Sequence, residues 1–578
     1  MVKYERMKNR LSFLILLLFF FFFPLFWPHQ AKANFPNLNS PNNKFGIHLA
    51  IPAYEDLEKA ANLVNSNGDW GYVTLVMQEN DLNKNKWQGI FDQLRKFHLI
   101  PIIRLATSFE NGYWRTPQIE EAQKWVDFLN SLNWVVKNRY VVLFNETNRA
   151  DEWGGRVDPK DFAEITYNFA KNLKESNVDF FIMMAGLDSA APSQLPQYED
   201  EAVFLKKTLI TQKNLFDYLD GWASHSYSKN GRQRSRNSTY NYQWELAILK
   251  NLGIEKNLPV FITETGFPHR EGKGPDFSFP SEKVIADLTR NYFVEILKDP
   301  KVVAITPFIL NYQDEPFDHF SWQKPNSNEF YSQYETVQKV AKIKGEPVQE
   351  EKIVLSNQLP EKLIKNSTYQ LGLMIKNEGQ GFWDQKDGYS LTLKGLPNNA
   401  SYFFSDFSTL SPFEEKTVWL YLKTGEKTGK IPLKINLTKN NQVIGNQIDW
   451  DLEIVPETTI KIITKLFLKR KTNGNDFKFL IYNQKEEVVY GLNRFEIKNG
   501  ETEIKGIKNL VIDEQYRLVL MKPLYLPRQM FLKIGEKDNV AIFKTLLPFD
   551  FNQDGRFSLS DFGALIKKPK LLKLFLRQ

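Results

Sequence analysis

A series of eight short apolar runs between residues 45 and 310 constrains the fold of this chain more than any other feature. Consecutive runs are separated by longer, often amphipathic stretches, such as PQIEEAQKWVDFLNSLNWVV at residues 117–136. Apolar runs of this length are typical of strands buried on both faces, and their alternation with helical periodicity indicates repeated βα units. The strand-like runs are Phe45–Ile51, Gly71–Met77, Leu99–Ala106, Tyr140–Glu146, Asp179–Leu187, Leu219–Tyr227, Pro259–Gly266 and Val302–Leu310.

Eight βα units in about this length predict a (β/α)8 barrel, a fold of the α/β class, over residues 43–345. A doubly wound open sheet is the alternative arrangement of the same units. No glycine-rich phosphate loop follows the first apolar run, so the barrel is the favoured prediction.

The sequence changes character near residue 350. Segments such as TYQLGLMIKN at 368–377 and KTVWLYLKT at 416–424 alternate apolar and polar side chains, which is typical of strands with one buried face. We therefore expect an Ig-like β-sandwich at 350–456 and a second β-rich domain at 457–547, followed by a distinct segment at 548–578.

The N-terminus has the features of an export signal. Basic residues between positions 3 and 10 precede LSFLILLLFFFFFPLFW at residues 11–27, and AKA at 31–33 offers the small residues of a cleavage site. Residues 1–33 are therefore predicted to be a signal peptide, with an uncleaved membrane anchor as the alternative. The chain has no cysteine, so we expect a bacterial exported protein, secreted or tethered at the cell surface, without disulfides.

The overall charge argues against one class of partner. A net charge of +7 is spread over 578 residues, and no strong basic cluster interrupts the main body of the chain. We interpret this charge as an aid to solubility and expect no nucleic-acid partner.

Two glutamates close the fourth and seventh apolar runs, Glu146 in LFNET and Glu264 in FITETGF. The C-terminal ends of the strands meet at one rim of a barrel, where the chemistry of such folds takes place. Glycoside hydrolysis needs two carboxyl groups there, one protonated to assist the leaving oxygen and one ionised to attack the sugar. A single glutamate at a strand end is more often a solvated cap or an ion-pair partner, but the pair favours catalysis.

The order of the runs, with NE after the fourth strand and TETG at the seventh, resembles the clan A glycoside hydrolases. The resemblance covers about residues 45–340 and implies a retaining (β/α)8 enzyme. It also implies that Glu146 is the general acid/base and Glu264 the nucleophile. Asn145 would then hydrogen-bond the 2-hydroxyl of the sugar.

Three further residues fit a substrate site. His225 and Tyr227, in WASHSYS, are two apart and so share one face of the sixth strand. The resemblance places this pair against the substrate, with Tyr227 hydrogen-bonded to the nucleophile. Arg104 is charged within the apolar run IPIIRLA and is a candidate to steady a catalytic carboxylate through two hydrogen bonds. The alternatives are a packed histidine, a core tyrosine and an ion pair at the rim.

The eighth run departs from the clan, whose members often carry a tryptophan there as a sugar platform. In this chain TPFILNYQDEPFDHFSW leaves Tyr312, Phe308 or Trp322 as the candidate platform. His48 in the first run and Trp153 after Glu146 are further candidate sugar contacts, because aromatic faces stack on apolar sugar faces. Tryptophans in loops are also common packing anchors.

A second chemical pattern lies at the C-terminus in DFNQDGRFSLSD, residues 550–561. Its spacing of oxygen ligands, with Gly555 at position 6, matches a calcium loop, and the aspartate at position 12 resembles one dockerin repeat. Dockerins normally have two repeats, so one repeat favours a Ca²⁺-stiffened end over a cohesin partner. The predicted ligands are Asp550, Asn552, Asp554, Arg556 through its carbonyl, Ser558 and Asp561. The alternative to a calcium loop is a polar turn. A C-terminal helix is predicted to follow the loop within residues 548–578.

These patterns together predict a secreted glycosidase that cleaves O-glycosidic bonds of a poly- or oligosaccharide by double displacement, with no cofactor for catalysis. The two carboxyl groups should lie about 5–5.5 Å apart, the spacing of retaining enzymes. The rival hypothesis is a non-catalytic carbohydrate-binding or cell-surface scaffold protein on an inherited barrel.

Overall fold

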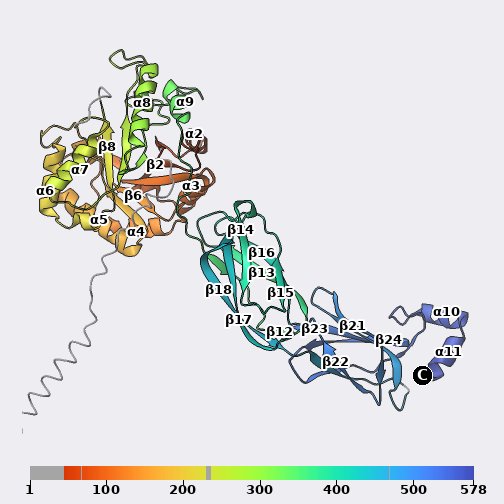
Figure 1. The fold of residues 1–578 in the computed structure, drawn as a ribbon. Helices are drawn as coiled ribbons and strands as arrows, with labels where there is room; N and C mark the ends of the chain where they lie inside the picture. The colour runs from red at the N-terminus through yellow and green to blue at the C-terminus, as the bar shows by residue number, and fades with distance from the viewer. Residues whose placement is uncertain (1–43, 67, 229–235, 468, 578) are drawn as a thin grey trace, which may run out of the picture. The chain divides into compact units, whose positions relative to one another are not determined.

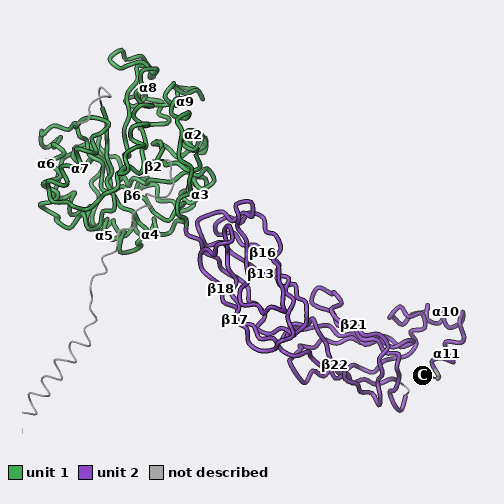
Figure 2. Tube along the Cα trace, in the orientation of Figure 1, with its two compact units in different colours: residues 1–349 green, residues 350–578 purple. Residues whose placement is uncertain are grey.

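The computed structural model describes residues 44–66, 68–228, 236–467 and 469–577. They form two compact units that divide between Gln349 and Glu350 (Figure 2). The predicted signal peptide at 1–33 lies outside the described residues. Among the helices that are described, none is long and apolar enough to cross a membrane.

Unit 1 contains eight strands in two parallel sheets, one in the order β1-β2-β3-β6-β7 and one in the order β10-β9-β8 (Figure 1). Each strand coincides with one of the eight predicted runs. The strands are β1 (Gly46–Leu49), β2 (Gly71–Gln78), β3 (Leu99–Ala106), β6 (Arg139–Leu143), β7 (Phe180–Met184), β8 (Trp222–Tyr227), β9 (Val260–Gly266) and β10 (Val302–Ile305). A short hairpin of β4 (Phe109–Glu110) and β5 (Tyr113–Trp114) follows β3.

Several predicted strand ends are wrong, most of all those of β6, β7 and β10. β7 ends at Met184 instead of Leu187. β10 ends at Ile305 instead of Leu310, because Pro307 has no N–H to donate to a ladder. β6 ends at Leu143 instead of Glu146, because Phe144 has a φ of 73° and leaves the extended conformation.

A few hydrogen bonds join the outer strands of the two sheets. Ile305 N donates to Lys44 O at 2.9 Å, and His48 N donates to Pro307 O at 2.9 Å, beside a parallel bridge between Phe45 and Ile305. At the other edges, Asp220 N before β8 donates to Ile182 O of β7 at 2.8 Å. Unit 1 is therefore a mixed α/β unit with two parallel sheets whose outer strands are hydrogen-bonded to each other.

Eight helices lie among these strands in the described part of unit 1. In α5 the Asp158 side chain caps the first turn by accepting from two backbone N–H groups, and Pro159 occupies the first helical position. Phe162, Phe169 and Leu173 of α5 share one buried face. The helices are α2 (Tyr54–Val64), α3 (Lys84–Lys96), α4 (Ala122–Asn130), α5 (Pro159–Ser176), α6 (Glu201–Thr211), α7 (Asn241–Asn251), α8 (Glu282–Ile296) and α9 (Ser332–Gln338).

An aromatic cluster between the two sheets gives them a common interior. Tyr72 of β2, Tyr140 of β6 and Phe181 of β7 meet Phe261 of β9, with ring centroids 5.1–6.4 Å apart. All four side chains are buried. Edge-to-face aromatic pairs contribute about 0.5–1.5 kcal/mol each beyond the area they bury, so this cluster helps to hold the strand ends in place.

Unit 2 consists of antiparallel-rich sheets with alternating burial and two apolar cores. Its first half pairs the sheets β11-β13-β16-β15 and β12-β18-β17-β14, and its second half pairs β22-β19-β25 and β21-β20-β23-β24-β26. In β16, for example, Val418, Leu420 and Leu422 are buried while the side chains between them are more exposed. The Ig-like assignment and the predicted domain boundaries stay predictions.

The strands of the first half are β11 (Ile353–Leu355), β12 (Lys362–Ile364), β13 (Thr368–Asn377), β14 (Tyr389–Lys394), β15 (Ser401–Phe404), β16 (Glu415–Lys423), β17 (Gly429–Lys439) and β18 (Gln442–Val455). Those of the second half are β19 (Thr458–Ile463), β20 (Gly474–Tyr482), β21 (Val488–Ile497), β22 (Glu501–Ile507), β23 (Gln515–Lys522), β24 (Leu524–Lys533), β25 (Asn539–Ile542) and β26 (Pro548–Asp550). Two helices, α10 (Leu559–Lys567) and α11 (Lys570–Arg577), end the unit.

Candidate active site

Glu146 lies three residues beyond β6, in a backbone with two left-handed residues. Phe144 and Glu146 have φ values of 73° and 33°, which cost roughly 1–3 kcal/mol each for residues other than glycine. A hydrogen bond of 2.9 Å from Glu146 N to Gly186 O fixes this turn. The position of the Glu146 carboxyl therefore depends on a locally strained backbone.

Glu264 lies inside β9, and its side chain is surrounded by residues from three other strands. Its Oε1 is 3.8 Å from His48 Nε2 of β1 and 3.6 Å from Arg104 Nη1 of β3. Tyr227 OH of β8 donates a hydrogen bond of 3.1 Å to its other oxygen, Oε2. Tyr227 and Arg104 thus both contact Glu264, although Arg104 makes a single ion pair instead of two hydrogen bonds.

His225 stands between the two glutamates. Its Nδ1 is 2.9 Å from Glu146 Oε1 and 3.8 Å from Glu264 Oε2. One oxygen of each carboxyl and a ring nitrogen of His225 all lie within 4.8 Å of one another. Among the described residues, this is the one group of three or more His, Asp or Glu side chains arranged so closely.

The surroundings of Glu264 favour its ionised form. Burial raises the pKa of its carboxyl, but the charges of His225 and Arg104 and the hydrogen bond from Tyr227 outweigh burial, so the pKa is lowered overall. Burial lowers the pKa of His48 to about 3, so this imidazole stays neutral and adds little positive charge. Burial also lowers the pKa of His225, but Glu264 and Glu146 reverse this effect and raise it.

Arg149 is a partner of Glu146 that the sequence did not identify. Its Nη1 is 3.3 Å from Glu146 Oε2. Asp151 accepts two hydrogen bonds from Arg149, at 3.1 and 2.7 Å, and Asp188 Oδ2 lies 3.6 Å from Nη1. An acid two residues after an arginine is too common to signal this arrangement, which depends on the left-handed turn at Glu146.

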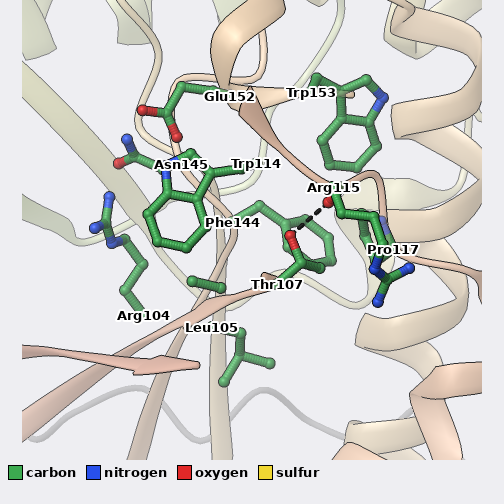
Figure 3. Close-up of a pocket in the computed structure, with 11 residues that line it drawn as sticks. Arg104, Leu105, Thr107, Trp114, Arg115, Pro117, Phe144, Asn145, Glu152 and Trp153 are labelled. Carbon is green, nitrogen blue, oxygen red and sulfur yellow. Dashed lines mark hydrogen bonds between the residues drawn. The ribbon is translucent and has the colours of Figure 1, made fainter. Parts of the chain in front are cut away.

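A pocket is lined by Asn145, the neighbour of Glu146 in the chain, and by Arg104, the ion-pair partner of Glu264 (Figure 3). It is a small hollow that is partly open to solvent. The Oδ1 atom of Asn145 is buried there and accepts no hydrogen bond from any described residue. Trp114 of β5 and Glu152 also line the pocket, and neither was singled out from the sequence.

The aromatic candidates differ in how accessible they are. Trp153 is 1% exposed and packs edge-on against Phe144 and Phe162, which fits a packing anchor better than a free sugar platform. Trp322 is also buried. Tyr312 and Phe308 are partly exposed, and the Phe308 ring lies 5.2 Å from that of His48, whereas Tyr312 packs on Phe317.

The C-terminal loop is held by its own polar groups. Asp550 Oδ2 accepts from Gly555 N at 3.2 Å, and the Asp561 carboxylate accepts from Asn552 N at 3.2 Å and Ser558 N at 2.8 Å. Gly555 has a φ of 81°, the conformation that the sharp turn of a calcium loop requires. Asp550 Oδ1 is buried and has no hydrogen-bond partner among the described residues.

The remaining loop side chains point less clearly to a metal. Asp554 Oδ1 accepts from Arg556 N at 2.8 Å, and Ser558 Oγ lies 2.6 Å from Ser560 Oγ while capping α10. The loop carboxylates are not gathered within 4.8 Å of one another as the catalytic candidates are. The orphaned Asp550 oxygen and the oxygen-rich donor set fit Ca²⁺, but in this structure the loop is not contracted around a common point.

Comparison with known proteins gives similarities of structure only. No family model matches the chain, and no curated protein matches it in sequence. Among solved structures, the family 51 α-L-arabinofuranosidase AbfB of Bifidobacterium longum is 10% identical with a TM-score of 0.34, over 64% of this chain and 89% of its own. A GH5-4 broad-specificity endoglucanase of Clostridium longisporum is 13% identical with a TM-score of 0.33, over 50% and 85%.

A third similar structure is a β-mannanase of Thermomonospora fusca in complex with mannotriose. It is 13% identical with a TM-score of 0.33, over 51% of this chain and 87% of its own. At these scores and identities the likeness says nothing of what this chain does. The functional conclusion therefore has to rest on the site.

Proposed function

We propose that unit 1 is a retaining glycoside hydrolase acting on a poly- or oligosaccharide. The observation that carries this proposal is the approach of Glu146 and Glu264 across His225, with one atom of each within 4.8 Å. That closeness supports the retaining separation of about 5–5.5 Å over the wider gap, about 6.5–9.5 Å, that inverting enzymes keep for a water.

We also propose that the eight strands of unit 1 form a (β/α)8 barrel. The bridge between Phe45 and Ile305 and the bond from Asp220 to Ile182 support closure at both pairs of edges. In a barrel the C-terminal ends of the strands share one rim, which accounts for the meeting of Glu146 after β6 with His225 of β8 and Glu264 of β9.

The surroundings of the two carboxyls support different roles in a double displacement. Glu264, which Arg104 and Tyr227 favour as a carboxylate, attacks the anomeric carbon while Glu146 donates its proton to the leaving oxygen. Glu146 then removes a proton from water, the water attacks the same carbon, and Glu264 is released. His225, hydrogen-bonded to Glu146, is placed to share the proton that Glu146 gives and recovers.

Two other functions account for less of the geometry. A non-catalytic carbohydrate-binding or scaffold protein has no use for a buried carboxylate kept ionised beside a second one. A metal centre could use the Glu146–His225–Glu264 group as ligands. However, the guanidinium groups of Arg104 and Arg149 lie 3.6 and 3.3 Å from these carboxylates and already supply the positive charge.

The test is turnover of a panel of activated aryl glycosides and oligosaccharides by the unaltered protein, Glu264→Gln and Glu146→Gln. We expect both variants to lose at least about 10³-fold in kcat, and NMR of the first product to show the anomeric configuration of the substrate. A product of opposite configuration would reject retention. Undiminished turnover by Glu264→Gln would reject the assignment altogether.

We further propose that the protein is exported and that its C-terminal loop binds one structural Ca²⁺. Asp550, Asn552, Asp554, Ser558, Asp561 and the carbonyl of Arg556 would hold the ion, which would crosslink the loop and the start of α10. The unpartnered Asp550 oxygen supports this proposal. Calcium has no part in the proposed catalysis.

A further inference from the structure

Glu152 is a third carboxyl group at the site, and the double displacement does not use it. It ends the short 3₁₀ turn Ala150–Glu152 and lines the pocket together with Asn145 and Arg104. Figure 3 shows the Glu152 carboxyl, the Asn145 amide and the Arg104 guanidinium pointing to the same side of this pocket. The three polar groups therefore converge on one space.

The position of Glu152 costs stability. Burial raises the pKa of its carboxyl to about 7, although the charge of Arg104 and the amide of Asn145 act in the opposite direction. Within the described residues no ion pair includes Glu152. A partly buried carboxylate whose hydrogen-bond partner is a neutral amide, with no ion pair, is unfavourable in its charged form, and a glutamine of the same shape would avoid that cost. A chain gains nothing in stability from such a residue, which points to a use in binding.

The loop that carries Glu152 is tied to a neighbouring aromatic residue. Gly154 N donates to Trp114 O at 2.8 Å. Gly154 has a φ of 63°, and a Cβ there would lie 2.3 Å from Thr116 Oγ1, so only glycine allows this approach. The contact places Glu152 and the partly exposed indole of Trp114 on the same pocket.

We propose that Glu152, Trp114 and Arg104 form a subsite that binds one neutral sugar ring beside the nucleophile, with Glu152 bonded to a ring hydroxyl. This inference rests on the proposed glycosidase function and specifies the substrate for it. The indole offers an apolar face to the ring, and the carboxyl and guanidinium groups offer an acceptor and donors to its hydroxyls. Glu152 is thus a specificity-determining residue and not a catalytic one.

The chemistry of the pocket also says which sugars it disfavours. A uronic acid or a sulfated sugar would bring a second negative charge beside Glu152, which repels it at neutral and alkaline pH. Arg104 offsets this repulsion only in part, because it already forms an ion pair with the Glu264 carboxylate, 3.6 Å away. We therefore assign the subsite to an uncharged ring.

The test compares the unaltered protein with Glu152→Gln and with a matched control, Glu164→Gln, on the exposed side of α5. The best neutral substrate of the panel is used for steady-state kinetics. We expect Glu152→Gln to lower kcat/KM about tenfold or more, mainly through KM, and Glu164→Gln to leave it within twofold. The ratio of kcat/KM for neutral oligosaccharides to kcat/KM for uronic-acid oligosaccharides should fall in Glu152→Gln and stay unchanged in Glu164→Gln.

The melting temperature separates a binding role of Glu152 from a structural one. If the carboxyl stabilised the fold, Glu152→Gln would lower the melting temperature, whereas a binding residue that costs stability predicts a rise. A pKa raised by folding makes the carboxyl destabilising as pH rises through about 7, so Glu152→Gln should gain melting temperature relative to the unaltered protein at pH 8.5 but not at pH 5. Unchanged kinetics would overturn the inference, as would a lower melting temperature of Glu152→Gln at pH 8.5. If instead the unaltered protein turns over no glycoside of the panel, the proposed function fails first and the subsite falls with it.

Discussion

At the scale of single residues, the two carboxyls of the site differ in the groups that surround them. Glu264 is approached by a guanidinium, a phenol and two imidazoles, while Glu146 is bonded to His225 and Arg149. A carboxylate that attacks carbon has to stay ionised and correctly aimed through the reaction. The phenol of Tyr227 serves both needs, because it donates to one oxygen of Glu264 and its own raised pKa keeps the proton on the phenol.

Tyr227→Phe tests this role of the phenol. Loss of one hydrogen bond to a charged group corresponds to about 1.5–3 kcal/mol, so kcat/KM should fall about 10- to 100-fold. Tyr227 lowers the pKa of Glu264, so its removal should also move the acidic limb of the kcat/KM profile to higher pH. The measurement is a pH–rate profile on one aryl glycoside. A lower rate with an unmoved acidic limb would show that Tyr227 binds substrate and does not tune the nucleophile.

Most of the residues that the sequence could predict lie on strands, and Asn145 and Glu146 lie just beyond one. Glu264, His225 and Arg104 each stand at a position that apolar periodicity assigns to a strand end, so their convergence follows once the strands are parallel. Arg149 and Glu152 lie after the end of β6, and Trp114 lies on the two-residue strand β5. Their placement follows from left-handed backbone at Phe144, Glu146 and Gly154, and no periodic pattern encodes such turns.

At the scale of elements, apolar runs locate strands well because burial on both faces requires them to be apolar throughout. The ends are harder, since β6 and β10 stop where a left-handed residue and a proline interrupt the ladder. Between the two sheets, packing depends on the cluster of Tyr72, Tyr140, Phe181 and Phe261.

Phe181→Ala tests whether this cluster holds the two sheets together. The centroid of the Phe181 ring lies 5.2 and 5.3 Å from those of Tyr140 and Phe261. Loss of the ring should lower the free energy of unfolding by about 3–5 kcal/mol. Phe181→Leu, which keeps most of the volume, should cost markedly less. Denaturant unfolding followed by tryptophan fluorescence measures both. Equal losses in the two variants would show that the ring is not packed between the sheets.

A buried acidic pair on α6 and α7 makes a second prediction at this scale. Glu245 accepts hydrogen bonds of 2.6 Å from Trp222 Nε1 and Asn241 Nδ2, and Glu201, fully buried, lies against it. Burial and the neighbouring Glu245 raise the pKa of Glu201 well above its usual value, and burial raises that of Glu245. Folding therefore favours the protonated forms of the two carboxyls.

Because folding raises these pKa values, the stability that they contribute is present at low pH and is lost as pH rises through the folded values. We expect Glu201→Gln to raise the melting temperature at pH 9 by several degrees and to change it little at pH 5. Differential scanning calorimetry at both pH values is the measurement. Glycosidase turnover at 25 °C should be unaffected, because Glu201 lies outside the pocket lining. A variant destabilised equally at both pH values would show that the carboxyl is needed for its shape alone.

At the scale of the whole molecule, the chain divides between residues 349 and 350 into an α/β unit and a β-rich unit with separate cores. The hydrophobic periodicity also changes near residue 350, because the period of two that suits strands with one buried face does not suit the helices of unit 1. The halves of unit 2 meet in a shared structure, in which Leu363 and Val511 form a bridge, so their boundary is less distinct than the sequence indicated.

Calcium should therefore act on one unit only. An ion that binds the folded loop at 100 times its dissociation constant stabilises that fold by about 2.7 kcal/mol. We expect Ca²⁺ to raise the calorimetric transition of unit 2 and leave that of unit 1 unchanged, and a chelator to reverse the effect. Turnover of aryl glycosides should not depend on Ca²⁺, because every proposed catalytic residue belongs to unit 1.

Two variants make the calcium experiment specific. Asp550→Asn removes the buried carboxylate whose Oδ1 has no other partner among the described residues, so the response to Ca²⁺ should disappear. Asp451→Asn changes an exposed aspartate on β18 and should respond as the unaltered protein does. If Asp550→Asn is instead stabilised and both proteins ignore Ca²⁺, the loop is a polar turn whose buried carboxylate is a cost. That outcome has a physical basis too. Burial raises the pKa of Asp550, and the nearby carboxylates of Asp561 and Asp554 raise it further by repelling its charge. The direction of the stability change in this one variant thus separates a metal loop from a turn.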